Sequence, residues 1–170
     1  MKKKFMCILL LIASICVMHY FSTQDGVTSA NQSNTAIQII DKIREKVTLK
    51  NNKLEYINEK IQNKLKPYGK SFVVRKMAHF SMYALIGGVG MIVIFLFSEN
   101  IFMSASLSFV FTVLYALFDE FTQLGIDGRD GNIIDVFIDS SGCFVAITAL
   151  TILFLIQRGI KHIFNKNKKD

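Results

Sequence analysis

Three groups of polar and ionisable side chains are the residues of this chain that could do chemistry. Within each group, members recur at three- or four-residue intervals, which place them on one face of an α-helix. In chain order the groups are Arg75, His79 and Tyr83, then Asp119, Glu120 and Gln123, then Asp135 and Asp139. Lys76 follows the first of these residues, and Arg129 lies in a glycine-containing turn before the third group.

One interpretation of these residues is an acid–base or metal site. His79, Glu120 and an aspartate of the third group are able to move a proton beside a lipid phosphate or to hold a divalent cation. No metal motif accompanies them, because HExxH is absent and residues 127–132 lack the alternating oxygen ligands of an EF-hand loop. We therefore assign no metal ligand and no catalytic residue, and we expect no cofactor.

The same side chains also permit a binding site or a purely structural contact. In a binding site, Arg129 and Lys76 would bind a phosphate or carboxylate while the acids orient these two cations. In the structural alternative, Arg129 pairs with Glu120 or Asp135. His79 then bonds to Gln123, and the contacts lock three helices together. Spacing alone leaves these alternatives open.

The distribution of apolar residues indicates a membrane protein. The 170 residues are 51% hydrophobic and 19% charged, with a net charge of +7 and a mean hydropathy of +0.37. These totals are only mildly unusual, but four stretches lack Asp, Glu, Lys and Arg altogether: 5–24, 77–98, 100–118 and 140–157. Each is about as long as the ~17–25 residues that span a bilayer core. The pattern excludes a secreted disulfide module, a disordered tail and an ordinary cytosolic enzyme.

We expect an all-α integral membrane fold of four transmembrane helices in a single domain, residues 1–170. The expected spans are about 5–21, 73–97, 101–118 and 133–157, with a basic tail at 158–170. Three lysines precede the first span, which has the features of an uncleaved signal anchor. Three residues separate the second and third spans, so that pair is antiparallel. This topology brings the three polar groups to one face of the membrane.

The segment between the first two spans, residues 22–72, is polar and amphipathic. Residues 21–34 are rich in Ser, Thr, Asn and Gln without periodicity, which predicts an extended connector. Apolar residues then recur at helical intervals over 36–47 and 54–65. They predict an amphipathic helical hairpin, or two short helices, on the membrane surface. A mobile solvated loop is the alternative.

The placement of charge indicates the partners and the orientation. Residues 77–157 hold one arginine and seven acids, whereas basic residues flank the spans. Lysines beside apolar helices are attracted to anionic headgroups, so the lipid bilayer is the expected partner; no nucleic-acid motif is present. Four spans put both termini on one side, and the basic termini favour the cytoplasm, although lysines in the 22–72 segment favour the opposite orientation. We expect a multi-pass protein of the cell membrane.

Three ordered motifs resemble those of the VanZ-like membrane proteins, over nearly the whole chain. They are Arg75-Lys76-x-x-His79-Phe80-x-x-Tyr83, Tyr115-Ala116-x-x-Asp119-Glu120-x-x-Gln123 and Gly128-Arg129-x-Gly131-x-x-x-Asp135-Val136-x-x-Asp139-x-x-Gly142. Departures at Thr122, Asn132 and Ala146 touch packing more than the polar residues. The resemblance implies a bacterial envelope protein associated with reduced susceptibility to teicoplanin and related glycopeptides.

Two functions follow as hypotheses from different classes. The sequence favours a non-enzymatic protein that binds or shields an envelope lipid or peptidoglycan precursor at the outer membrane–water interface. The alternative is a membrane enzyme that acts on a phosphate-bearing envelope lipid through His79, Glu120 and Asp135. The predicted polar cluster, whether binding or structural, comprises Lys76, His79, Tyr83, Asp119, Glu120, Gln123, Arg129, Asp135 and Asp139.

Overall fold

The computed structural model describes residues 2–48, 56, 60, 61, 63 and 69–166. Within these residues the long helices are α1 (Lys2–Ser22), α2 (Gly26–Thr48), α4 (Lys70–Ser98), α5 (Ile101–Gln123) and α6 (Ile133–Lys166). All but α2 are long and apolar enough to cross a bilayer, α6 over Ile133–Lys161. The described residues contain no strand, and the predicted all-α membrane fold with four spans is confirmed.

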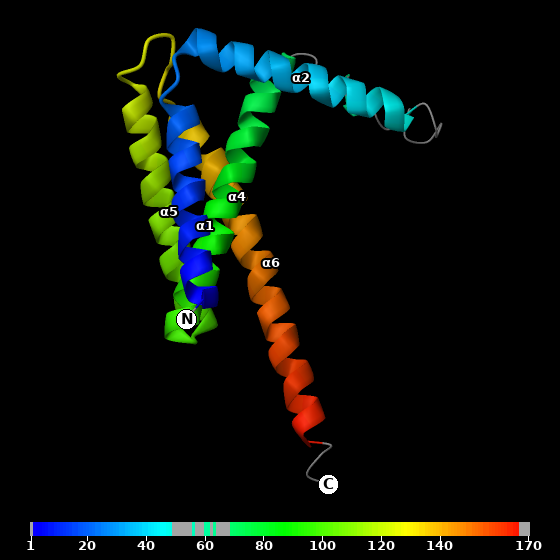
Figure 1. Ribbon diagram of the computed structural model, residues 1–170, viewed down its shortest axis with the longest axis vertical. Helices are drawn as coiled ribbons and strands as arrows, with labels where there is room; N and C mark the ends of the chain where they lie inside the picture. The colour runs from blue at the N-terminus through cyan, green and yellow to red at the C-terminus, as the bar shows by residue number, and fades with distance from the viewer. Residues whose placement is uncertain (1, 49–55, 57–59, 62, 64–68, 167–170) are drawn as a thin grey trace.

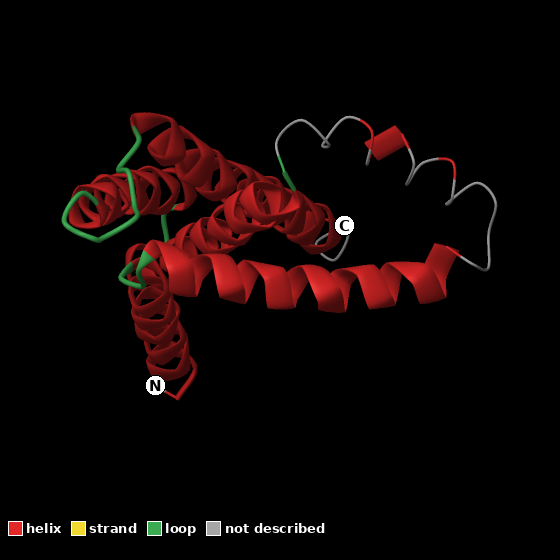
Figure 2. Cartoon of the chain, turned by 90° about the horizontal axis from the view of Figure 1, so that it is seen from above, coloured by secondary structure: helices red, strands yellow, loops and turns green. Residues whose placement is uncertain are grey.

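The four apolar helices form a bundle, and α2 lies across one end of it (Figure 1; Figure 2 shows the same end from above). Helix α4 is central, because it packs against α1, α2, α5 and α6. The beginning of α1 and the end of α6 lie at the end of the bundle opposite α2 (Figure 1). Which of these ends faces the cytoplasm stays a prediction.

The turn between α4 and α5 makes these two helices antiparallel. Glu99 adopts the left-handed conformation with φ 53°, and its backbone N–H donates to the carbonyl of Phe95 at the end of α4. Asn100 then caps α5, because its side-chain oxygen accepts from the backbone N–H of Met103 at 3.1 Å. Large apolar side chains such as Phe102 and Leu114 remain exposed on the outside of α5, as lipid contact requires.

Small residues let α4 and α6 approach closely in the middle of the bundle. A Cβ atom placed on Gly142 would meet the carbonyl oxygen of Phe80, and one on Gly87 would meet the sulfur of Cys143. Because glycine has no Cβ atom, the backbones of α4 and α6 lie nearly in contact at these positions. Small residues permit this close packing between membrane helices. This contact sets the position of the first turns of α6 against α4.

The predicted extended connector over residues 21–34 is wrong, because α2 begins at Gly26. The Asp25 carboxylate caps this helix: one oxygen accepts from the backbone N–H of Thr28 at 2.9 Å and the other from its hydroxyl at 2.7 Å. A polar cap of this kind starts a helix without the apolar periodicity that a sequence pattern detects. Most of the second predicted amphipathic series, 54–65, lies outside the described residues.

The cap at Asp25 predicts a pH-dependent start of α2. The hydrogen bonds that the Asp25 carboxylate accepts from Thr28 hold the pKa of that carboxyl below its ordinary value. A lowered folded-state pKa stabilises the helix above the unfolded value, and this contribution is lost as the pH falls through the folded value. We expect Asp25→Ala to speed amide hydrogen exchange at Thr28 and Ser29 at neutral pH. Asp25→Asn keeps a capping oxygen but carries no charge. In this variant the protection of these amides from exchange should persist over the pH range in which the wild-type carboxylate becomes protonated.

Candidate functional site

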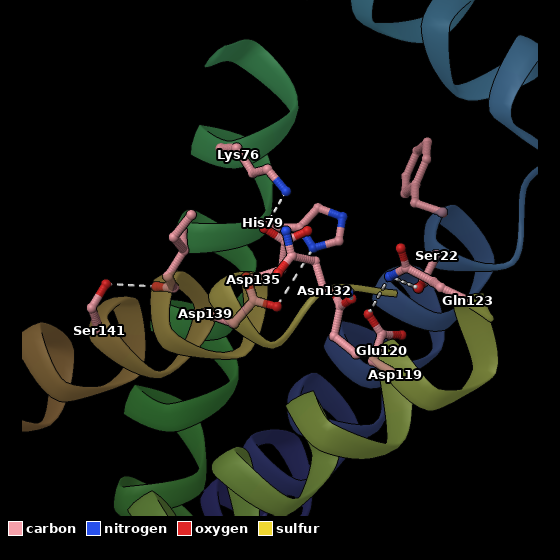
Figure 3. A network of polar contacts seen from close by, with 12 residues as sticks. Ser22, Lys76, His79, Asp119, Glu120, Gln123, Asn132, Asp135, Asp139 and Ser141 are labelled. Atoms are coloured by element: carbon pink, nitrogen blue, oxygen red, sulfur yellow. Dashed lines mark hydrogen bonds and ion pairs between the residues drawn. The ribbon is translucent and has the colours of Figure 1, made fainter. Parts of the chain in front are cut away.

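The predicted polar residues gather where α4 begins, α5 ends and α6 begins, at the end of the bundle that α2 covers (Figure 1, Figure 3). Helix α5 continues to Gln123, so its three polar residues lie in its last two turns. Figure 3 shows the side chains from three helices pointing toward one another: Lys76 and His79 from α4, Asp119, Glu120 and Gln123 from α5, and Asp135 and Asp139 from α6.

Arg129 fastens the loop between α5 and α6 to the corner between α1 and α2. Its Nη2 donates to the carbonyl of Phe21 at 3.2 Å and its Nε to that of Gln24 at 3.1 Å. A third, longer bond runs from Nη1 to the side-chain oxygen of Gln123 at 3.4 Å. Next to it, the backbone N–H of Gly26 donates to the carbonyl of Asp127 at 3.0 Å. Two segments far apart in the sequence are therefore held together by one guanidinium and one backbone bond.

The predicted pairing of Arg129 with Glu120 or Asp135 is not what the structure shows. The hydrogen-bond acceptors of Arg129 among the described residues are neutral, so its charge is not cancelled by a direct ion pair. Burial, followed by repulsion from Arg75, lowers the pKa of the Arg129 guanidinium, while nearby acids including Asp119 raise it. A guanidinium stays protonated in proteins, so a half-buried positive charge faces this region.

The other predicted cation, Lys76, has an acidic partner. Its ammonium forms an ion pair with Asp135 of α6, and both side chains are largely buried. Glu120 instead supports the beginning of α6, because one of its oxygens accepts from the backbone N–H of Asn132 at 2.8 Å. The side chain of Asn132 in turn caps the helix by accepting from Ile134 at 3.0 Å. Glu120 and Asp135 therefore already have structural partners.

A deeper layer of the cluster lies below these contacts. His79 Nδ1 lies 3.6 Å from a carboxylate oxygen of Asp139, rather than bonding to Gln123 as the structural alternative requires. The amide of Gln123 donates to Asp119 at 3.1 Å and to the hydroxyl of Ser22 at 3.0 Å, which connects α5 to α1. Tyr83, one turn below the histidine, is fully buried.

Two neighbouring cavities open on this region and share three side chains, Arg75, His79 and Arg129. One, of about 380 Å³, is largely apolar and lies between α1, α2 and α4; Met18, Ala36 and Met82 are among its lining residues. The other, of about 230 Å³, is polar and is lined also by Lys76, Gln123, Asn132 and Asp135. The shared residues therefore stand between an apolar space and a polar one.

A family model, VanZ/LLP1, matches residues 6–155. The chain belongs to the VanZ/LLP1 family. The match includes all nine residues of the predicted cluster and ends before the basic tail. No curated protein and no solved structure matches the chain. Membership of this family and the four apolar helices identify a membrane protein.

Sequence reasoning left three residues out of the predicted cluster of this VanZ/LLP1 protein. Arg75 lines both cavities, and it makes no hydrogen bond or ion pair with a described residue. Its place four residues before His79 on one helical face was noted in the sequence, but the residue was not included in the predicted cluster. Ser22 and Asn132 bond to Gln123 and Glu120, but nothing in the sequence pairs residues so far apart.

Proposed function

We propose that this membrane protein binds an envelope lipid by its phosphate-bearing headgroup, and that this binding lowers susceptibility to teicoplanin and related glycopeptides. The observation that carries the proposal is the pair of cavities that share Arg75, His79 and Arg129. A lipid has an apolar chain joined to a charged headgroup, and the two cavities offer those two environments side by side. Pockets that combine apolar walls with a few polar groups are the usual form of a small-molecule site.

The polar cavity is lined by three cationic side chains and two acidic ones, Asp130 and Asp135, and this balance favours an anion. Lys76, which the sequence assigned to anion binding, is already paired with Asp135. Arg75 has no partner among the described residues, and Arg129 bonds only to neutral groups there. Two guanidinium groups that repel each other across a cavity gain most from a ligand that bears a phosphate, the group they bind in bidentate fashion.

The position of the site fits recognition at the membrane surface. The cavities lie under α2 and the α5–α6 loop, at the end of the bundle away from the beginning of α1. We propose that both termini face the cytoplasm, as the basic residues at 2–4 and in the 158–170 tail favour. The polar cavity then opens at the outer interface, where envelope lipids present headgroups and glycopeptides act. Shielding of a lipid-linked precursor at that surface would lower antibiotic access.

Replacement of Arg75 tests this function. We expect Arg75→Gln to weaken binding of dioctanoyl phosphatidate to purified protein in neutral detergent by about 10- to 100-fold, because hydrogen bonds from a charged donor contribute about 1.5–3 kcal/mol. Dioctanoylglycerol, which lacks the phosphate, should bind weakly to both forms. Binding of inorganic phosphate is measured as well. Phosphate that binds as tightly as phosphatidate indicates a site for a free anion, and weaker phosphate binding indicates a lipid site, since only the lipid also fills the apolar cavity.

The matched control is Arg158→Gln. Arg158 is an exposed arginine that donates to the carbonyl of Glu99 at the far end of the bundle, so its loss should leave phosphatidate binding unchanged. In a susceptible host, expression of wild type should raise the inhibitory concentration of teicoplanin, and Arg75→Gln at equal membrane level should not. Equal binding by wild type and Arg75→Gln contradicts the proposal. Release of inorganic phosphate from the lipid would favour the enzyme alternative instead.

A further inference from the structure

The deeper layer of the cluster places His79, which lines both cavities, beside three groups that line neither cavity: Tyr83, Asp119 and Asp139. His79 and Tyr83 come from α4, Asp119 from α5 and Asp139 from α6. One ligand atom each from His79, Asp119 and Asp139 can be chosen so that all three lie within 4.8 Å of one another. Figure 3 shows the labelled members of this group converging between three helices. An imidazole nitrogen and two carboxylates therefore meet inside the bundle.

Four oxygens of this group are buried and lack hydrogen bonds. Asp119 and Asp139 are each 1% exposed, and Tyr83 is 0% exposed. Asp119 Oδ1, both carboxylate oxygens of Asp139 and the Tyr83 hydroxyl have no hydrogen-bond partner among the described residues. Buried polar groups in proteins are nearly always hydrogen-bonded, and buried charges are paired or coordinate metals. Three unpartnered carboxylate oxygens on two neighbouring aspartates, with a buried tyrosine hydroxyl one turn from His79, therefore favour a bound ligand or a neutralising charge.

The neighbouring cations do not supply that charge. The ammonium of Lys76 pairs with Asp135, one turn above Asp139 on the same helix, and Arg129 bonds to the α1–α2 corner. His79 lies 3.6 Å from Asp139, which is longer than a hydrogen bond. A structural lock would show short bonds between these groups, as Gln123 shows to Asp119 and Ser22.

We propose that His79, Asp119 and Asp139 bind a divalent transition-metal ion such as Zn²⁺ or Mn²⁺. Imidazole nitrogen suits Zn²⁺, carboxylate oxygen is accepted by both ions, and Mg²⁺ or Ca²⁺ would favour an all-oxygen set. Two aspartates balance the double positive charge inside the bundle, which removes the cost of burying either charge alone. Three protein ligands leave a coordination position for a fourth group, and the unpartnered hydroxyl of Tyr83 lies in the same cluster.

This site shares His79 with the proposed headgroup site, but its two aspartates line neither cavity. The metal would join α4, α5 and α6 at the level below the headgroup, so it has a structural consequence whether or not lipid binds. Sequence motifs do not reveal it, because each ligand comes from a different helix and the three positions are far apart in the chain.

Metal binding to the purified full-length protein is the test. Protein prepared without chelators is incubated with ZnCl₂ or MnCl₂, freed of excess metal and analysed for metal content. We expect about one ion per chain in wild type, and a loss of thermal stability when EDTA is added. Asp119→Asn and Asp139→Asn should each weaken Zn²⁺ binding by more than about 100-fold, since residues that merely orient metal ligands already contribute about 10–100-fold.

Two further variants make the result specific. Asp135→Asn removes a neighbouring acid of the same helix outside the ligand set and should retain the metal. Arg75→Gln should also retain it, which separates this proposal from the headgroup site. If folded wild type binds neither Zn²⁺ nor Mn²⁺ in direct titration, the metal site is ruled out without reference to any variant. Equal loss of metal in Asp135→Asn and Asp139→Asn would also overturn the assignment, because it would indicate binding by acidic charge alone.

Discussion

Arg129→Lys is expected to abolish the proposed protection against teicoplanin and to loosen the corner between α1 and α2, although it keeps the positive charge. The guanidinium donates to Phe21, Gln24 and Gln123 at once, with its donors spread in a fixed plane. An ammonium at the end of a lysine side chain cannot reach all three acceptors. Because hydrogen bonds from a charged donor contribute about 1.5–3 kcal/mol each and are not additive, we expect a loss of about 3 kcal/mol of stability.

The effect is measured in two ways, by hydrogen exchange at the α1–α2 corner and by the teicoplanin phenotype at equal membrane level. Faster exchange at Thr23 and Gly26 would show that the loop no longer holds the corner, since Gly26 donates to Asp127 of that loop. Arg158→Lys is the control, because Arg158 lies at the other end of the bundle. If Arg129→Lys shows wild-type susceptibility to teicoplanin and wild-type hydrogen exchange at the α1–α2 corner, a positive charge at this position is sufficient and the guanidinium geometry is not needed.

The membrane architecture could be predicted because lipid contact leaves a strong mark on the sequence. Four charge-free stretches are long enough to span a bilayer, and the two-residue turn at Glu99 and Asn100 forces its helices to be antiparallel. The beginning of α2 could not be read in this way. Its signal is a single capping side chain, Asp25, within a polar stretch that carries no apolar periodicity.

The gathering of the polar residues at one end of the bundle was predictable from the sequence, whereas the contacts between them were not. Helical spacing and antiparallel order place the polar groups at one end of the bundle. The partner of each side chain depends on features that spacing does not contain. Arg129 turns to backbone carbonyls because Gly128, with φ 72°, and Gly26 let two loops touch. His79 faces Asp139 because the α4–α6 contact fixes how the two helices are rotated.

That contact leads to the second large effect, in which Gly142→Ala is expected to destabilise the packing of α4 against α6. The added Cβ would meet the carbonyl oxygen of Phe80, a backbone atom that cannot move aside as a side chain can. Overpacking of this kind costs about 1–3 kcal/mol or more. Helix propensity acts in the opposite direction, since alanine exceeds glycine by about 0.8–1 kcal/mol. We expect the clash to outweigh that gain and to reduce the yield of monodisperse protein severely.

Gly159→Ala separates the clash from the helix propensity. Gly159 lies in the same helix, and a Cβ there meets no described atom within 4 Å, so this variant should fold as well as wild type or slightly better. Phe80 follows His79, and Gly142 lies one turn after Asp139, so separating the backbones also separates that pair. Any Gly142→Ala protein that does fold should therefore bind Zn²⁺ more weakly than Gly159→Ala. Equal yield and equal affinity in the two variants would show that the close approach of α4 and α6 does not position the cluster.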